Sequence, residues 1–189
     1  MTPGAVLALL ADYARERPAE GALLARFRAL VAHTPAPFSR AQFEPGHITC
    51  SACVLSRDGA RVVLLYHGKL ARWLQPGGHL EAGDRGPLAA ALREVREEAG
   101  LAELELLPGP DGSSLLDVDI HPIPARGAEA AHLHYDLRFA LRARESERLR
   151  ASAESRALRW VEVARLAELT DEESVTRLAA RAQERARLR

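Results

Sequence analysis

Three glutamates in the segment REVREE are the residues of this sequence best placed to do chemistry. Glu94, Glu97 and Glu98 are spaced at i, i+3 and i+4, so a helix would bring their carboxylates to one face. Like charges at this spacing destabilise a helix by roughly 0.2–0.5 kcal/mol per pair, and negative charge in the last turn opposes the helix dipole. Either Arg93 and Arg96 relieve this repulsion at a solvated surface, or a hard divalent cation such as Mg²⁺ makes the cluster favourable.

A glycine pair upstream of the cluster favours the metal. Gly77 and Gly78 follow Pro76 where a short apolar run ends, which predicts a turn. Glycine lacks Cβ, so the backbone can come close to a ligand, and a carbonyl there can itself bind a cation. A Gly-Gly turn followed by a loop and a carboxylate-bearing helix is the layout of a Mg²⁺-dependent phosphate site.

The stretch from Gly78 to Leu101 resembles the Nudix box. In that motif a glycine, a glutamate, an Arg-Glu-aliphatic-x-Glu-Glu core and a Gly-aliphatic pair recur at fixed spacing. The matching residues are Gly78, Arg93, Glu94, Val95, Glu97, Glu98, Gly100 and Leu101. There are two departures: Asp84 replaces the mid-motif glutamate, and eight residues rather than seven separate it from Arg93. We assign the extra residue to the loop before Pro87, and whether Asp84 reaches a metal stays open.

The resemblance implies a Nudix-type α/β/α sandwich with a mixed sheet. It also implies Mg²⁺- or Mn²⁺-dependent hydrolysis of a nucleoside diphosphate linked to another moiety X. Glu94, Glu97 and Glu98 would hold the metal with the carbonyl of Gly77, Arg93 would orient Glu94, and Glu94 or Glu98 would take a proton from water. In many members an acid outside the box completes the site, and the candidates here are Glu129, Asp136 and Glu154.

A second group of polar residues lies in the segment HLHYDLRF. Strand alternation places His132, His134, Asp136 and Arg138 on one face. This face is either the wet side of a half-buried strand or the lining of the substrate cleft. In the second case His134, Asp136 and Arg138 would meet phosphate or base, together with His79 beside the box glycine. A zinc site formed by His132, His134 and Asp136 is a third interpretation.

Hydrophobic periodicity and turn signals predict the helices and strands that carry these residues. We expect residues 1–45 to form a helical extension, with two helices within 3–33, that packs on a Nudix domain at 46–189. In that domain the helix from Pro87 to Ala99, closed by Gly100, buries Leu88, Leu92, Val95 and Ala99. Strands are expected at 47–56, 60–67, 72–75, 103–107, 114–120, 132–143 and 156–162, and a last helix opens on a capping box of Thr170 and Glu173.

Composition limits the binding partners and the cellular location that we expect for the protein. Lys+Arg and Asp+Glu both number 26, so no net field favours nucleic acid or an anionic membrane. No segment approaches the ~20 apolar residues of a membrane span. Cys50 and Cys53 should be reduced thiols on opposite faces of a strand. We therefore expect a cytoplasmic enzyme, with homodimerisation as an open option. Two alternatives remain: a catalytically weak, nucleotide-binding sensor, and an interaction module that docks through its helical ends.

Overall fold

The computed structural model describes residues 1–68, 71–145, 147–151 and 155–188 of the chain. The helices are α1 (Pro3–Glu16), α2 (Gly21–His33), α3 (Pro87–Ala99) and α4 (Glu173–Arg187), with 3-10 turns η1 (Pro18–Glu20) and η2 (Val163–Glu168). The strands are β1 (Gly46–Leu55), β2 (Arg61–His67), β3 (Arg72–Leu74), β4 (Gly77–His79), β5 (Leu104–Leu106), β6 (Leu115–Ile123), β7 (His132–Ala143) and β8 (Ser155–Glu162). Within these residues no helix is both long and apolar enough to cross a bilayer.

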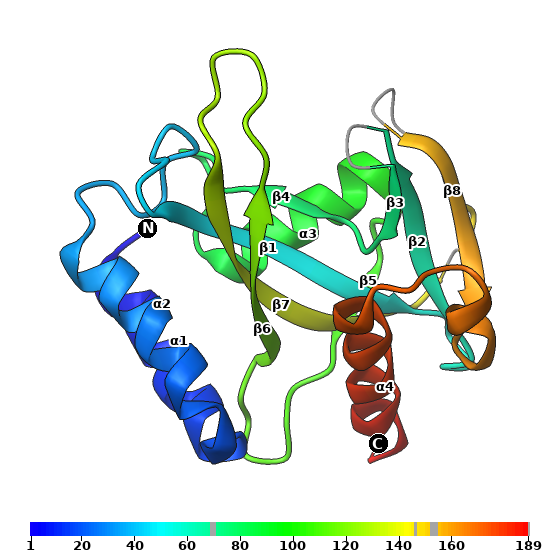
Figure 1. Ribbon diagram of the computed structural model, residues 1–189. Coiled ribbons are helices and arrows are strands. Elements are labelled where there is room, and N and C mark those ends of the chain that lie inside the picture. The colour runs from blue at the N-terminus through cyan, green and yellow to red at the C-terminus, as the bar shows by residue number, and fades with distance from the viewer. Residues whose placement is uncertain (69–70, 146, 152–154, 189) are drawn as a thin grey trace.

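The described strands form one mixed sheet built around β1 (Figure 1). β1 runs parallel to β7 along its whole length, from Gly46 opposite Leu133 to Leu55 opposite Arg142. On its other side β1 pairs antiparallel with β4 in its middle and with β2 near its end. β5 and β6 extend the sheet beyond β7, and β3 and β8 extend it beyond β2.

Helices cover both faces of this sheet. α3 and the α1–α2 pair pack on the face that carries Ile48 and Cys50, whereas α4 and η2 pack on the face that carries Cys53 and Leu55. Alternate residues of a strand point to opposite faces. Because helices cover both faces, the end of β1 that carries Cys53 and Leu55 is apolar on both sides. The expected α/β/α sandwich is confirmed, and both cysteines are free and buried on opposite faces.

The helix that carries the glutamates begins and ends where the sequence predicted. Pro87 opens α3, and Gly100 ends it with a left-handed φ of 69°, a conformation that costs glycine little. Val95 and Ala99 are fully buried, as predicted. The other half of the buried face differs from the prediction, because Ala90 and Ala91 are fully buried while Leu88 and Leu92 are only partly so. Small side chains at the contact let the helix axis approach the sheet closely, and the leucines pack beside it.

Two local predictions were wrong. The Gly77–Gly78 pair does not form an isolated turn but lies in β4, whose backbone pairs with Cys50 and Ser51 of β1. The capping box of α4 is absent, because Glu172 is the N-cap residue and no side chain caps the helix. The hydroxyl of Thr170 instead accepts a hydrogen bond from the N–H of Glu172 at 3.2 Å. Pairing with β1 placed the glycines in a strand. The turn before α4 engages the hydroxyl of Thr170 that the sequence pattern had assigned to the start of the helix.

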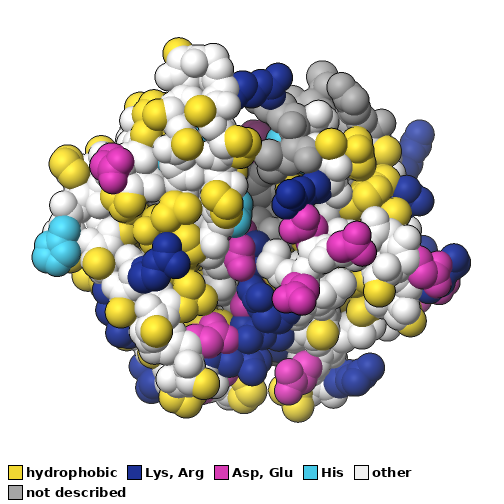
Figure 2. All heavy atoms as spheres, in the orientation of Figure 1, with side chains coloured by type: hydrophobic (Ala, Val, Ile, Leu, Met, Phe, Trp, Pro, Cys, Tyr) yellow, Lys and Arg dark blue, Asp and Glu magenta, His cyan; other side chains and the backbone are white. Residues whose placement is uncertain are grey.

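The N-terminal helices are joined to α4 by a buried phenol and by ion pairs. Tyr13 is fully buried; its hydroxyl donates to Glu20 at 2.7 Å and accepts from Arg181 at 2.9 Å. Arg181 also pairs with Glu20, and Arg185 with Glu16. Figure 2 shows basic and acidic side chains gathered between the α1–α2 pair and α4. The helical pair also shares its apolar core with the sheet, while the domain boundary at residue 45 stays a prediction.

We expect Tyr13→Phe to lower the free energy of unfolding by about 1 kcal/mol at neutral pH, because two hydrogen bonds are lost. Burial, reinforced by the charge of Asp117, raises the pKa of Tyr13. Above the pKa of about 10 of an unfolded tyrosine, the unfolded chain loses a proton that the native protein keeps, so native stability falls as pH rises. Urea unfolding at neutral and alkaline pH should show a smaller alkaline loss in Tyr13→Phe.

Tyr66→Phe is the matched control, because Tyr66 is half-buried and packs edge-on against Trp73. It should keep the alkaline loss of the native chain. If Tyr13→Phe and the native protein lost the same free energy of unfolding at alkaline pH, titration of Tyr13 would not be the cause of that loss.

Candidate active site

Arg93 lies inside the acidic cluster rather than beside it. Its Nη1 donates to Glu94 Oε1 and to Glu97 Oε2, both at 3.0 Å. Its Nη2 donates to the carbonyl oxygen of His79 at 2.8 Å, and Nε and Nη2 both reach the carboxylate of Asp84. One guanidinium therefore joins the end of β4, the loop after it and the C-terminal half of α3, and it offsets the repulsion between the glutamates.

Asp84 holds Arg93 and caps a turn. Its carboxylate accepts from Arg93 at 3.1 and 3.2 Å and from the N–H of Glu81 at 2.8 Å, while its own N–H donates to the carbonyl of Glu81. Burial raises the pKa of Asp84, but the hydrogen bonds from Arg93 and Glu81 outweigh it, so the pKa is lowered overall. The side chain is 6% exposed and directed at Arg93, which makes it a positioning residue in this structure.

The β4 glycines let two of the glutamates approach the backbone closely. The N–H of Gly77 donates to Glu98 Oε2 at 2.9 Å. A Cβ on Gly78 would lie 2.6 Å from Glu94 Oε1, and a Cβ on Gly77 would lie 2.3 Å from the Cβ of Ser51. Any larger residue at these two positions would displace the carboxylates or β1, so the site requires glycine for space.

The donors gathered here are those that a hard cation prefers. Carboxylates of Glu94, Glu97 and Glu98 converge on Arg93 and the backbone of β4, and all of the candidate ligand atoms are oxygens. The side chain of Glu97 is 56% exposed and that of Glu94 only 13%, so one carboxylate faces solvent while another is shielded. Burial raises the pKa of Glu94 above its usual value, even though Arg93 opposes the shift. The residues present therefore fit Mg²⁺ or Mn²⁺.

Comparison with protein families identifies the family of the chain. The model of the NUDIX domain matches residues 46–181, well over half of the chain. The chain belongs to the Nudix family of hydrolases. A comparison with curated proteins gave no match.

Solved structures agree with the family. An Ap4A hydrolase of C. elegans shares 18% identity, covers 75% of this chain and 96% of its own, and has a TM-score of 0.56. A NUDIX family hydrolase from Clostridium perfringens shares 26% identity over 75% of this chain and 97% of its own, with a TM-score of 0.53. The dihydroneopterin triphosphate pyrophosphohydrolase of E. coli shares 20% over 70% and 91%, with a TM-score of 0.56. At these identities the likeness describes chiefly the fold.

The second group of polar residues lies on the sheet face opposite α3, where this Nudix hydrolase buries a network of charges. Asp136 is 3% exposed and accepts hydrogen bonds from Ser51 at 2.6 Å, Thr49 at 3.2 Å and Arg138 at 2.8 Å. Arg138 is 2% exposed and also pairs with Asp117 and Asp119 of β6. Both side chains are thus engaged by the protein, and contact between Asp136 or Arg138 and substrate stays a prediction.

Histidines gather at the start of β1 on the same face. Five of the seven in the chain are linked by ring contacts of 4.8–5.4 Å between centroids: His47, His79, His121, His132 and His134. Burial, with the neighbouring imidazoles, lowers the pKa of His134 to about 2, and burial also lowers that of His47. Sequence analysis singled out three of these but missed His47 and His121, although the alternation in HITCS could have placed His47 with Thr49 and Ser51.

The acids proposed to complete the site lie apart from it or cannot be assigned. Glu129 is exposed in the turn between β6 and β7, where its nearest cation is Arg40 at 3.9 Å. Glu154 lies outside the described residues. Asp136 faces away from α3, as described above. The identity of an extra acid stays open.

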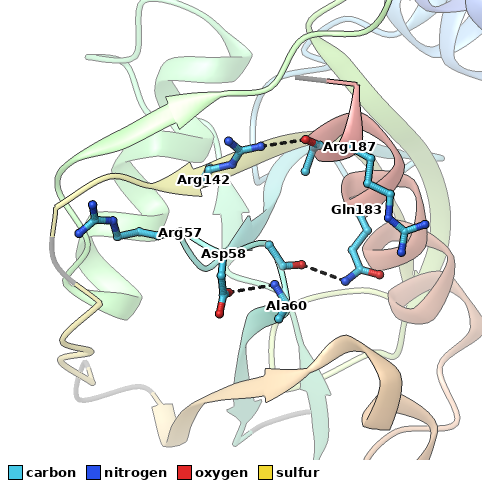
Figure 3. Close-up of a pocket in the computed structure, with 8 residues that line it drawn as sticks. Arg57, Asp58, Ala60, Arg142, Gln183 and Arg187 are labelled. Atoms are coloured by element: carbon cyan, nitrogen blue, oxygen red, sulfur yellow. Dashed lines mark hydrogen bonds between the residues drawn. The ribbon is translucent and has the colours of Figure 1, made fainter.

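A hollow elsewhere on the molecule is unrelated to the glutamates. It lies between the β1–β2 turn and the end of α4 (Figure 3). Gln183 donates to the carbonyl of Gly59 at 2.9 Å across it, and Arg142 donates to the carbonyl of Ala186 at 3.3 Å. These hydrogen bonds join the β1–β2 turn and β7 to α4. None of the predicted site residues lines the hollow.

We expect Asp84→Asn to lower the free energy of unfolding by about 1–3 kcal/mol, because the half-buried Arg93 loses the carboxylate that it binds through both Nε and Nη2. Glu81→Gln is the matched control: Glu81 approaches Arg93 only to 3.7 Å and is 65% exposed, so its loss should cost less than about 0.5 kcal/mol. Urea unfolding of both variants measures the difference. Equal effects would show that Asp84 does not anchor Arg93.

Proposed function

We propose that this Nudix hydrolase is a Mg²⁺-dependent pyrophosphohydrolase, with Mn²⁺ as an alternative cation. Its substrate would be a nucleoside diphosphate linked to another moiety X. The observation that carries the proposal is the convergence of Glu94, Glu97 and Glu98 on Arg93 and on the two β4 glycines. Arg93 offsets the repulsion between these carboxylates, and a divalent cation that bridges them to a phosphate chain would offset it further.

The residues divide the work as follows. Glu97, Glu98 and the carbonyl of Gly77 would hold the cation with Glu94, and a bound cation neutralises phosphate oxygens and makes water more acidic. Glu94 or Glu98 would take the proton from water, and Glu94 is tested first because Arg93 orients it. Arg93 fixes the direction of Glu94 through the 3.0 Å hydrogen bond between them.

The moiety X is proposed only as a class. His79 follows the glycines at the end of β4, and His134 of β7 is in ring contact with it; both are candidates to meet the base or the phosphates. Neighbouring folds carry the names Ap4A hydrolase and dihydroneopterin triphosphate pyrophosphohydrolase, which makes dinucleoside polyphosphates and pterin triphosphates reasonable members of a test panel. Cytoplasmic location, homodimerisation and lack of binding to nucleic acid or membranes also remain proposals.

Release of phosphate or pyrophosphate from a panel of nucleoside diphosphate derivatives, with Mg²⁺ or Mn²⁺, tests the proposal. The panel should hold nucleotide sugars, dinucleoside polyphosphates, damaged nucleoside triphosphates, pterin triphosphates and coenzyme-like compounds. We expect metal-dependent release, and a loss in kcat of about 10²–10⁴-fold in Glu94→Gln, because a general base contributes that much. Glu97→Gln should raise the Mg²⁺ concentration needed for half-maximal rate.

The matched control is Glu103→Gln, which removes one exposed carboxylate after α3 without touching the cluster. It should keep the native rate. Absence of release on the whole panel, together with metal-dependent binding of one compound, would instead identify a nucleotide sensor. If neither metal nor nucleotide bound, the cluster would be a surface held together by Arg93 alone.

A further inference from the structure

We propose that His47, His132 and His134 form a second metal site, built from imidazole nitrogens and suited to Zn²⁺. Among the residues that the structure describes, they are the one group of three candidate ligands whose donor atoms all lie within 4.8 Å of one another. The site is separate from the carboxylate cluster and does not depend on the proposed hydrolysis.

Two of the three rings are held in the orientation that a metal ligand needs. Nδ1 of His47 lies 2.9 Å from the carbonyl oxygen of Gln42, and Nδ1 of His132 lies 2.7 Å from that of Ala130. A carbonyl can only accept, so Nδ1 must carry the proton in both rings, and the lone pair is on Nε2. A backbone carbonyl behind the imidazole is the usual support of a metal-bound histidine.

Two of the three Nε2 atoms are buried, where water cannot satisfy them. His47 is 1% exposed and His132 7% exposed. Within the described chain, Nε2 of His47 and Nε2 of His134 are both buried without a hydrogen-bond partner. A buried polar atom without a partner costs about 1–3 kcal/mol, and two such imidazoles in contact with each other need an explanation. A bound cation would satisfy them together.

The spacing of the donors is close to that of a zinc site. A point equidistant from three atoms 4.8 Å apart lies roughly 2.8 Å from each, so inward movement of roughly 0.7 Å per ring would reach the usual Zn–N distance of about 2.1 Å. Three histidines leave the fourth position of a tetrahedral zinc open for water or a ligand. Mg²⁺ prefers oxygen, so the imidazoles select a borderline metal.

The parallel pairing of β1 with β7 builds the group. His47 lies directly opposite His134, and His132 lies two residues earlier on the same face of β7. Asp136, which the sequence offered as a third zinc ligand, is instead bonded to Ser51 and Arg138, and His47 takes its place. His79 and His121 border the group through ring contacts with His134.

Metal binding by the untagged full chain tests the site. The protein is stripped with a chelator, supplied with excess Mg²⁺ to fill the carboxylate cluster, and titrated with Zn²⁺ by calorimetry. We expect one equivalent of Zn²⁺ to bind. His134→Gln and His132→Gln should each weaken that affinity by about 100-fold or more, since loss of a ligand exceeds the effect of losing a supporting group. Co²⁺ in place of Zn²⁺ should give the strong visible absorption of tetrahedral coordination.

Matched variants separate this site from the carboxylates. His33→Gln removes an exposed histidine at the end of α2, and Glu97→Gln removes a carboxylate of the cluster; both should leave Zn²⁺ affinity unchanged. Circular dichroism and melting temperature establish that the histidine variants fold. Failure of the native chain to bind Zn²⁺ under excess Mg²⁺, or loss of Zn²⁺ in Glu97→Gln but not in His134→Gln, would overturn the proposal. The first result would not bear on metal-dependent hydrolysis, whereas the second would place the bound Zn²⁺ in the carboxylate cluster.

Discussion

The parallel pairing of β1 with β7 is the constraint on which the rest of the structure depends. It joins segments that lie about 87 residues apart, and its register sets His47 opposite His134 and Thr49 opposite Asp136. Since a slip of one residue would turn every side chain to the other face, the apolar positions that face α3 and α4 fix this register strongly. The free edge of β1 then receives β4, and with it the glycines that the carboxylates approach.

Because side chains alternate along these strands, the carboxylate cluster and the histidine group lie on opposite faces of one sheet. Gly78 faces α3 and Glu94, so oxygen donors collect on that side. His79, the next residue, turns its ring to the opposite face and contacts His47 and His134, while its carbonyl accepts from Arg93. The carboxylate cluster and the histidine group are thereby neighbours that share one short strand without sharing side chains.

Arg93 explains how three carboxylates persist near the end of α3. The sequence left open whether arginines or a metal relieve the repulsion; the structure shows that Arg93 binds two of the glutamates, and the metal stays a proposal. The guanidinium offsets the repulsion while the carboxylates of Glu94 and Glu97 remain close together. Asp84 in turn holds the guanidinium. Because Arg93 is itself anchored, it keeps the carboxylates preorganised. Fixed contacts within the protein, rather than disordered counterions, therefore offset the repulsion between them.

The sequence alone determined the local features of this protein. The span of α3, its left-handed end at Gly100, the order of the helices and of the strands other than β4, and the Nudix family all follow from short-range spacing, because helix periodicity and a spaced motif need no distant partner. Tertiary structure decided what depends on pairing. It made Gly77–Gly78 a strand, buried Arg138 among three aspartates and brought His47 to His134. Strand neighbours and register arise from contacts between distant segments, and one sequence does not state which segments meet.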